Sequence, residues 1–278
     1  MLRDYCGSNP LSLKETRMEM NHTVEANKQV QLPEHIRKQL ALEEITFSQE
    51  ELEKHYNGIY NRYVKRAIDL VLSCVLLAVL LPFYLIIALC IVLESGFPVL
   101  YRAQRGGYRG KTFRICKFRS MVKNADKIGG GTTALKDSRI TKTGAVLRKL
   151  KLDETAQIFN ILAGTMSFVG PRPELMQYVN QYEGIEKNIL NVRPGITDFS
   201  SLYLINLDEI VGSENADEIY EKFVLKKKNQ MRLKYVARVS FKTDCMLFGQ
   251  TVLRVLRKAF RVIFRIQAKP DKVVESVK

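Results

Sequence analysis

The sequence predicts an α+β protein that is mainly helical and attached to a membrane. Residues 70–93 form a run of 24 uncharged apolar residues, and residues 241–267 combine apolar and basic side chains at helical spacing. Between them, glycine and proline turns favour short strands and short helices around a site. The expected divisions of the chain are an N-terminal extension at 1–57, a membrane helix at 58–97, a core at 98–200 and a C-terminal part with an interfacial helix at 201–278.

Charge is distributed unevenly along the chain. The net charge is +15 over 278 residues, but residues 1–57 carry a net −3 and residues 58–278 a net +18. A body this basic requires a polyanionic partner, which could be nucleic acid, anionic lipid or a phosphorylated substrate. The five cysteines show no paired spacing, so we expect reduced thiols, no disulfide framework and no zinc site.

The N-terminal extension, residues 1–57, is polar and mixed in charge, with weak helical patterning. No apolar core of a signal peptide follows the start, so none is predicted. We interpret this segment as a mobile or partner-binding extension and not as part of a catalytic site.

The apolar run Leu70–Leu93 is long enough to cross a bilayer. At about 1.5 Å per residue it would reach about 36 Å as a straight helix, against a hydrocarbon core of about 30 Å. Pro82 lies near its centre, where it removes one backbone hydrogen bond and favours a kink. The twenty residues on either side each hold four basic residues, so positive charge gives no orientation. Two topologies stay open: a single-pass helix, which is the commoner outcome, and a helix that enters and leaves on one side.

A basic aromatic segment, KTFRICKFR, occupies residues 111–119. Alone, it could be a nucleic-acid-binding strand with stacking aromatics. Because it comes soon after the apolar run, we interpret its aromatic side chains as core or membrane contacts and expect no nucleic-acid partner. Lys117 and Arg119 are then candidates on its polar face.

The segment 147–174 reads LRKLKLDETAQIFNILAGTMSFVGPRPE and holds two adjacent carboxylates, Asp153 and Glu154. They lie between a basic approach and the rigid turn at 170–173. Acids flanked by cations suit a metal-bound diphosphate, because a carboxylate can hold the ion while guanidinium and ammonium groups absorb phosphate charge. An alternative makes Asp153 the N-cap of a helix that runs to Gly164.

Arg148 and Asp153 impose a geometric condition on this segment. They are five residues apart, which on one helix puts them about 140° from each other at about 100° per residue. If both face one phosphate, the helix must break near Leu152.

The same segment resembles the signature LRKxSLDELPQLxNVLxGxMSLVGPRPE of the bacterial sugar transferases that are monotopic polyprenyl-phosphate phosphoglycosyl transferases. The similarity covers about residues 58–260. Further blocks similar to those of the family occur in the same order as in the family. They lie upstream at 65–73, 101–121 and 137–149, and downstream at 192–197 and 235–252.

This resemblance implies an enzyme of the phosphoglycosyl transferase class. It would transfer a sugar phosphate from a UDP-sugar to a membrane-bound polyprenyl (undecaprenyl) phosphate and release UMP. Asp153 would be the nucleophile, forming a covalent aspartyl phosphosugar intermediate, and Glu154 would be the ligand of Mg²⁺.

The resemblance also implies substrate contacts and a membrane topology. Lys117, Arg148 and Arg172 would contact phosphate and nucleotide, and Arg119 is a further substrate-binding candidate. The family uses a proline-broken re-entrant helix, which favours Pro82 as the break.

Two departures from the family pattern bear on these expectations. Leu81 stands where many members have serine before the proline, so a hydroxyl that could satisfy a freed backbone carbonyl is missing. After Val192–Thr197 the chain continues with Asp198 and has no tryptophan anywhere, which affects contacts that could bear on sugar choice.

The segment 241–267 predicts a basic amphipathic helix suited to an anionic membrane surface. The alternative is a solvated helix packed on the core. Its apolar positions are Leu247, Val252, Leu256, Phe260 and Phe264, and its basic positions are Arg254, Arg257, Lys258, Arg261 and Arg265.

Together these features predict an enzyme of the bacterial inner membrane with its active site facing the cytoplasm. It would begin the assembly of a surface glycan such as capsule, exopolysaccharide or O-antigen. The competing hypotheses are a non-catalytic, membrane-tethered protein that binds nucleic acid or anionic lipid, and a transferase that moves the sugar alone and releases UDP. The sequence leaves open the sugar, the polyprenol and the formation of a homodimer.

Overall fold

The computed structural model describes residues 34–43, 45–125, 137–204 and 216–263. The chain divides into two compact units, Met1–Ala41 and Leu42–Lys278. In the first, the described element is helix α2, Glu34–Leu40, where exposed Glu34 and Lys38 form an i,i+4 ion pair of 2.8 Å. Everything below concerns the second unit.

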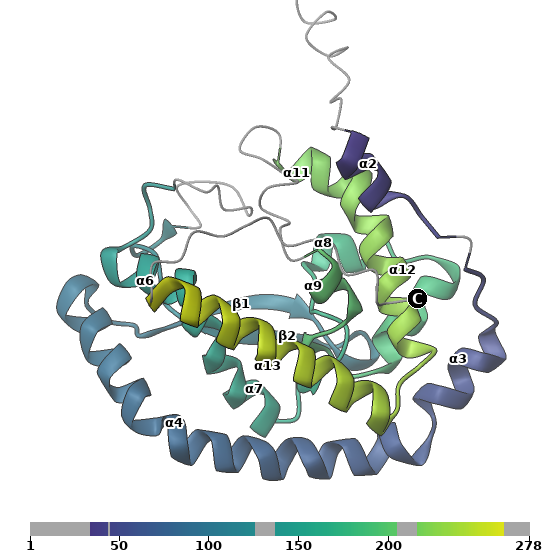
Figure 1. Cartoon of the computed structure of the whole chain (residues 1–278), viewed down its shortest axis with the longest axis horizontal. Coiled ribbons are helices and arrows are strands. Elements are labelled where there is room, and N and C mark those ends of the chain that lie inside the picture. The colour runs from purple at the N-terminus through teal and green to yellow at the C-terminus, as the bar shows by residue number, and fades with distance from the viewer. Residues whose placement is uncertain (1–33, 44, 126–136, 205–215, 264–278) are drawn as a thin grey trace, which may run out of the picture. The chain divides into compact units, whose positions relative to one another are not determined.

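The second unit is mostly helical, with short strands, as predicted (Figure 1). Its longest elements are helices α4, Lys65–Ser95, and α13, Phe241–Ile263. The other helices are α3 Gln49–Tyr56, α6 Lys142–Leu150, α7 Ile158–Leu162, α8 Met176–Val179, α9 Phe199–Tyr203, α11 Ala216–Ile219 and α12 Leu225–Val236; the π-helical turns are η1 Tyr60–Val64 and η5 Tyr220–Val224; the 3-10 helices are η2 Tyr108–Gly110, η3 Leu152–Gln157 and η4 Gly184–Asn191.

The strands form two small sheets. Strands β1, Leu100–Gly106, and β2, Thr112–Phe118, pair as an antiparallel hairpin. Strands β3, Ser167–Val169, and β4, Gly195–Thr197, pair in parallel. The second pairing joins the segment after the two carboxylates to the segment after the Val192–Gly195 turn.

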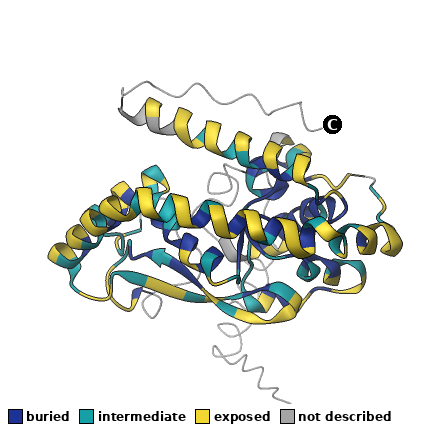
Figure 2. Cartoon of the chain, turned by 90° about the horizontal axis from the view of Figure 1, so that it is seen from below, coloured by how far each residue is buried: buried dark blue, intermediate teal, exposed yellow. Residues whose placement is uncertain are grey.

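Helix α4 contains the predicted apolar run and continues through Pro82. With the turn η1 before it, it forms the helix at Tyr60–Ser95, which among the described residues is the one long and apolar enough to cross a membrane. In Figure 1 it runs along the lower edge of the molecule and then changes direction toward α6. Many of its apolar side chains are exposed (Figure 2), as expected for a helix whose partner is lipid.

Polar contacts fasten both halves of α4 to the same body. Near its start, Arg66 donates to the carbonyls of Ile161 (2.5 Å) and Leu162 (2.9 Å) at the end of α7. In its second half, the Tyr84 hydroxyl donates to the carbonyl of Thr155 in η3 (2.8 Å). The helix therefore holds the segment 152–162 from both sides.

The last turn of α4 is also bound. The Glu94 carboxylate accepts from the backbone N–H groups of Lys142 (2.7 Å) and Thr143 (2.8 Å), so it neutralises the N-terminus of α6.

A buried polar network fixes the beginning of α4. Lys65 forms an ion pair with Asp244 of α13, and the hydroxyls of Tyr60 and Tyr235 each donate to the same carboxylate at 2.7 Å. Nearby, Asp69 accepts from the Ser167 hydroxyl at 3.1 Å. A buried charge with several hydrogen-bonded partners fixes one arrangement of the groups around it.

Apolar packing among the described residues includes the following two clusters. One joins α3, β3, η4, α9, α12 and the start of α13, and it includes Leu52 of α3, which has no exposed surface. The other joins the second half of α4 to the hairpin, α6 and η3. Helix α3 thus lies in the body, although it falls within the extension expected at 1–57.

Helix α13 occupies the predicted amphipathic segment up to Ile263; Phe264 and Arg265 lie outside the described residues. Leu247 is fully buried, whereas Val252, Leu256 and Phe260 are exposed. The helix therefore packs on the core near its start and leaves an apolar surface uncovered farther along.

Candidate functional site

The two carboxylates lie just after a sharp break in the chain. Helix α6 is capped at its start by Thr141, whose hydroxyl accepts from the Gly144 backbone N–H, and it ends at Leu150. Lys151 follows in the left-handed conformation, with φ of 58°, and the 3-10 helix η3 begins at Leu152. This confirms the predicted break near Leu152. Asp153 lies inside η3 and caps no helix, so its interpretation as an N-cap is wrong.

Glu154 binds two cations from different parts of the chain. Its Oε1 accepts from Lys117 Nζ of β2 at 2.9 Å and from the guanidinium of Arg172. Arg172 belongs to the segment 170–174, which reads GPRPE and is called the GPRPE turn below. Burial would raise the pKa of Glu154, but the charges of Arg172 and Lys117 outweigh it and hold the pKa well below its usual value. Glu154 is therefore ionised at neutral pH.

Asp153 has the opposite environment. Its side chain is buried, with 8% of the residue exposed, and no described group donates to its Oδ1. Burial and the charge of Glu154 raise its pKa, against the opposing charges of Lys117, Lys151 and Arg148. An unpaired, electron-rich carboxylate oxygen is the chemical requirement for a nucleophile or a metal ligand.

The structure thus brings together five of the six predicted substrate contacts and acids. Lys117 and Arg172 bind Glu154, and Arg148 lies within electrostatic range of Asp153. Arg119 lies elsewhere. Its Nη2 donates to the Ser95 and Gly96 carbonyls at the C-terminus of α4, and its Nε and Nη1 have no partner among the described groups. The roles of all these residues in binding and catalysis stay predictions.

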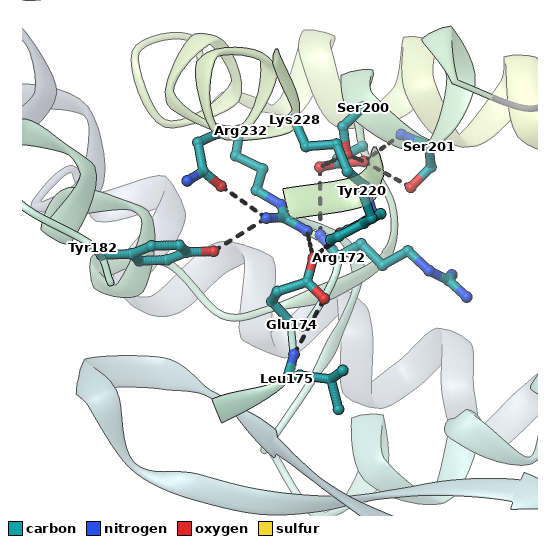
Figure 3. Close-up of polar contacts among 11 residues, drawn as sticks. Arg172, Glu174, Leu175, Tyr182, Ser200, Ser201, Tyr220, Lys228 and Arg232 are labelled. Atoms are coloured by element: carbon teal, nitrogen blue, oxygen red, sulfur yellow. Dashed lines mark hydrogen bonds and ion pairs between the residues drawn. The ribbon is translucent and has the colours of Figure 1, made fainter. Parts of the chain in front are cut away.

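A second polar cluster surrounds Glu174, the last residue of the GPRPE turn (Figure 3). Its Oε2 accepts from Arg232 Nη2 at 2.8 Å and from the Tyr220 hydroxyl, to which Lys228 Nζ also donates at 2.7 Å. Burial would raise the pKa of Glu174, but Arg232 and Lys228 lower it to about 2. In Figure 3 the Arg172 guanidinium points away from this cluster, in keeping with its bond to Glu154.

Lys228 is the titratable cation of this cluster. Burial lowers its pKa to about 8, with a smaller contribution in the same direction from the charges of Arg232 and Arg172, while Glu174 opposes the shift. Lys228 and Arg232 are both buried and bound within this cluster, so the cluster fixes the end of the turn that carries Arg172.

The model of the bacterial sugar transferase family matches residues 60–258 of the chain. The chain belongs to this family. The carboxylate pair, its cations and the Glu174 cluster all fall within the matched region.

Three relatives within the bacterial sugar transferase family illustrate the similarity. The UDP-N-acetylgalactosamine-undecaprenyl-phosphate N-acetylgalactosaminephosphotransferase of Aeromonas hydrophila is 37% identical over 50% of this chain and 34% of its own length. The UDP-glucose:undecaprenyl-phosphate glucose-1-phosphate transferase of Escherichia coli K12 is 35% identical over 70% and 40%. The exopolysaccharide production protein ExoY of Sinorhizobium fredii is 34% identical over 48% and 66%. The chain thus spans less than half the length of the first two relatives.

Asp198, where the chain departs from the usual pattern of the bacterial sugar transferases, has a structural position. It is fully buried and is the N-cap of α9, accepting from the Ser201 backbone N–H at 2.7 Å. It also accepts from the Arg172 backbone N–H at 3.3 Å. Asp198 therefore supports the turn from which Arg172 reaches Glu154.

The carboxylate pair offers a partial set of ligands for Mg²⁺. Among the described residues, no three acidic, histidine or cysteine side chains gather around one point. Asp153 Oδ1 is unpartnered, and both cations on Glu154 bind its Oε1. In phosphoryl-transfer sites Mg²⁺ is held by one or two carboxylates together with substrate phosphates and water. The carboxylate pair fits an ion delivered with a diphosphate and does not form a complete protein cage.

The Glu174 cluster was not predicted from the sequence. Glu174 closes the recognised GPRPE turn, but its partners Lys228 and Arg232 lie more than fifty residues farther along, in a segment that reads as an ordinary charged helix. The available signal was that α12 has little amphipathic character, which is typical of a helix buried on several sides.

Proposed function

We propose that this bacterial sugar transferase moves a sugar phosphate from a UDP-sugar to a polyprenyl phosphate, namely undecaprenyl phosphate, and releases UMP. The relatives named above support the donor and acceptor classes. The name of the Sinorhizobium relative supports a place in exopolysaccharide production. The reaction would be the first membrane step of glycan assembly.

One observation carries the proposal: a buried, unpartnered carboxylate oxygen on Asp153 lies beside a carboxylate already neutralised by two cations. Lys117 and Arg172 hold Glu154 in place and leave positive charge around the pair. Most buried side-chain oxygens in proteins have a hydrogen-bond partner, so the unpartnered Oδ1 of Asp153, next to Glu154 and its two cations, is a candidate for contact with a substrate.

In the proposed chemistry, Asp153 Oδ1 attacks the β-phosphorus of the UDP-sugar. The bond between that phosphorus and the bridging oxygen breaks, and UMP leaves with the electron pair. An oxygen of the polyprenyl phosphate then attacks the aspartyl phosphosugar, and Asp153 is released as a carboxylate. Neither step requires a general base, because both nucleophiles are anions.

Electrostatic stabilisation supplies most of the rate in such a transfer. Arg172 and Lys117 would receive the charge that develops on the diphosphate, and Arg148 would approach from the end of α6. Mg²⁺, held by Glu154 and the substrate phosphates, would neutralise further negative charge when it is bound.

The attachments of α4 support a re-entrant topology in one leaflet. A helix that spans a bilayer separates its ends by the hydrocarbon core of about 30 Å. Here polar groups at the start of α4, at Arg66, and at its end, at Glu94, bind one compact body. With Pro82 between them, this arrangement favours entry and exit on the same face, which for a UDP-sugar donor is the cytoplasmic face of the inner membrane.

The test is release of UMP by the purified full chain, with Mg²⁺, a polyprenyl phosphate and a panel of UDP-sugars that includes UDP-glucose and UDP-N-acetylgalactosamine. We expect one or more donors to yield UMP, and Asp153→Asn to reduce the rate by at least about 10³-fold. The exposed Glu51→Gln variant is the matched control and should retain the wild-type rate.

Other outcomes would contradict the proposal. Release of UDP would indicate transfer of the sugar alone. Full activity of Asp153→Asn would remove the nucleophile assignment, and absence of UMP with every donor would favour a non-catalytic binding protein.

A further inference from the structure

A polar hollow lies beside the start of the membrane helix, apart from the site described above. Its volume is about 240 Å³, several times the roughly 30 Å³ that one water occupies in the liquid. The residues that line it are Tyr56, Asn57, Arg62, Tyr108, Arg109 and Asn191.

The charge around this hollow is positive. Arg62 and Arg109 are exposed and line it, and the guanidinium carbons of Arg109 and Arg193 each lie 5.1 Å from the centre of the Tyr108 ring. Among the described residues, none of these three arginines forms an ion pair. Cation–π attraction to the Tyr108 ring therefore offsets part of the repulsion between the guanidinium groups of Arg109 and Arg193.

The tip of the hairpin is built to present one of these charges. Arg109 has a φ of 56°, a left-handed conformation that is uncommon for a residue with a side chain. The adjacent Gly110 also has a positive φ, of 72°. Strained backbone of this kind is concentrated at functional sites.

An acidic side chain lies near the rim of the hollow. Glu53 interacts with the Tyr56 hydroxyl and accepts a hydrogen bond of 2.7 Å from Gln49. It is not among the lining residues. The lining itself therefore offers amide and hydroxyl groups together with two guanidinium groups.

The hollow lies where lipid head groups are expected. Arg62 belongs to η1, the turn that leads directly into α4. On the same turn, Ile59 is 75% exposed and Tyr63 is 66% exposed, so apolar surface continues beside the cations. This combination of exposed apolar side chains and arginines is typical of the membrane interface.

The hollow is separate from the carboxylate pair. Thr112, near the hairpin tip, and Lys117, which contacts Glu154, are five residues apart on β2. At about 3.4 Å per residue these two positions are about 17 Å from each other. A phosphate in the hollow would thus be beyond contact with Glu154.

We propose that this hollow binds the phosphate head group of an anionic membrane lipid. Arg62 and Arg109 bind the phosphate oxygens, the amides of Asn57 and Asn191 donate to the remaining polar atoms, and the acyl chains continue over Ile59 and Tyr63. The bound lipid fixes the depth at which α4 enters the membrane. This site is additional to those for the donor and acceptor of the proposed reaction.

The test measures binding of short-chain phosphatidylglycerol to the full chain in a neutral detergent, by the shift in its thermal unfolding temperature. Short-chain phosphatidylcholine and inorganic phosphate are measured in parallel arms. The site variant is Arg62→Gln/Arg109→Gln. The matched control is Arg102→Gln/Arg114→Gln, which removes two exposed arginines from the same hairpin.

We expect saturable binding of phosphatidylglycerol to the wild type and the control variant, and an affinity at least about tenfold lower in the site variant. Phosphatidylcholine and phosphate alone should bind far more weakly. Equal weakening in both variants would show unspecific charge attraction and overturn the proposal. Binding of inorganic phosphate as strong as that of phosphatidylglycerol would overturn the lipid as occupant, and unaltered binding in the site variant would overturn the site.

Discussion

At the scale of single residues, Asp153 and Glu154 are neighbours in sequence with opposite electrostatic environments. Glu154 is paired with Lys117 and Arg172, whereas Asp153 is buried with an unpartnered oxygen. Pairs of titratable groups whose surroundings push their pKa values apart are common where two carboxylates have different roles. The division of labour proposed for this pair, nucleophile and metal ligand, follows that pattern.

Replacing each carboxylate by its amide should therefore affect the stability of the fold differently. The folded pKa of Glu154 lies below 4.5, so its ionised form stabilises the fold above that pH, and the stabilisation is lost as pH falls through the folded value. The folded pKa of Asp153 lies above 3.8, so its ionised form costs stability once pH rises through the folded value. At neutral pH we expect Glu154→Gln to lower the free energy of unfolding by about 1–3 kcal/mol, and Asp153→Asn to leave it unchanged or raise it.

Denaturant unfolding in detergent, at neutral pH and near pH 4, measures this difference. The difference in free energy of unfolding between the two variants should narrow at the lower pH, because the raised pKa of Asp153 leaves its carboxyl group less ionised there. A loss of stability in Asp153→Asn equal to that in Glu154→Gln would contradict the assigned environments.

At the scale of elements, helix α4 holds the turn that carries Asp153 and Glu154 and also presents an exposed apolar surface. Arg66 binds the end of α7, and Tyr84 binds the carbonyl of Thr155, two residues after Asp153. The Tyr84 ring also packs edge-on against Phe118 of β2, the neighbour of Lys117, with ring centres 5.1 Å apart. Both sides of the carboxylate pair are thus braced by one membrane helix.

Removing the Tyr84 hydroxyl should loosen the turn without removing the ring contact. For Tyr84→Phe we expect a loss of about 1 kcal/mol in the free energy of unfolding and a several-fold lower kcat, with little change in KM for the UDP-sugar. Tyr63→Phe removes an exposed hydroxyl from the start of the same helix and is the control. Equal kinetics for the two variants would show that the bond to Thr155 does not position Asp153.

The elements that the sequence predicted are those whose signals are local. The apolar run predicts α4, and apolar side chains at helical spacing predict α13. The angle between Arg148 and Asp153 predicts a break near Leu152 if both side chains face one phosphate, and Lys151 makes that break. The parallel pairing of β3 with β4 has no such signal, because it joins segments far apart in sequence. Arg119 shows the same limit: it was predicted on a polar face, but it is buried and bonded to the end of α4, a contact that has no local signal.

At the scale of the whole molecule, the second unit is tied to both ends of its membrane helix. Lys65 is buried against Asp244 of α13, and Glu94 binds the start of α6. The site is therefore assembled from the helix, the hairpin and the GPRPE turn together, and no single segment contains it. The Glu174 cluster, which joins this turn to α12, escaped prediction for the same reason.

The re-entrant topology proposed from these ties can be tested directly. In chains without their native cysteines, Asn57→Cys and Arg102→Cys place single exposed thiols before and after α4. In vesicles of known orientation, we expect an impermeant maleimide to label both positions from the same side, the cytoplasmic one. Labelling from opposite sides would establish a single-pass helix, and vesicles opened with detergent serve as the control for reactivity.

The bonds from Tyr84 and Arg66 to the segment 152–162 also have a thermodynamic consequence. These bonds couple the conformation of the segment 152–162 to the position of α4 in the membrane. Because coupling free energies are reciprocal, a ligand that stabilises this segment must stabilise the membrane-bound position of α4 by the same factor. Saturation with the nucleotide sugar should therefore make the protein harder to extract from the bilayer. Conversely, the lipid composition of the membrane should alter the affinity for a donor that never touches lipid.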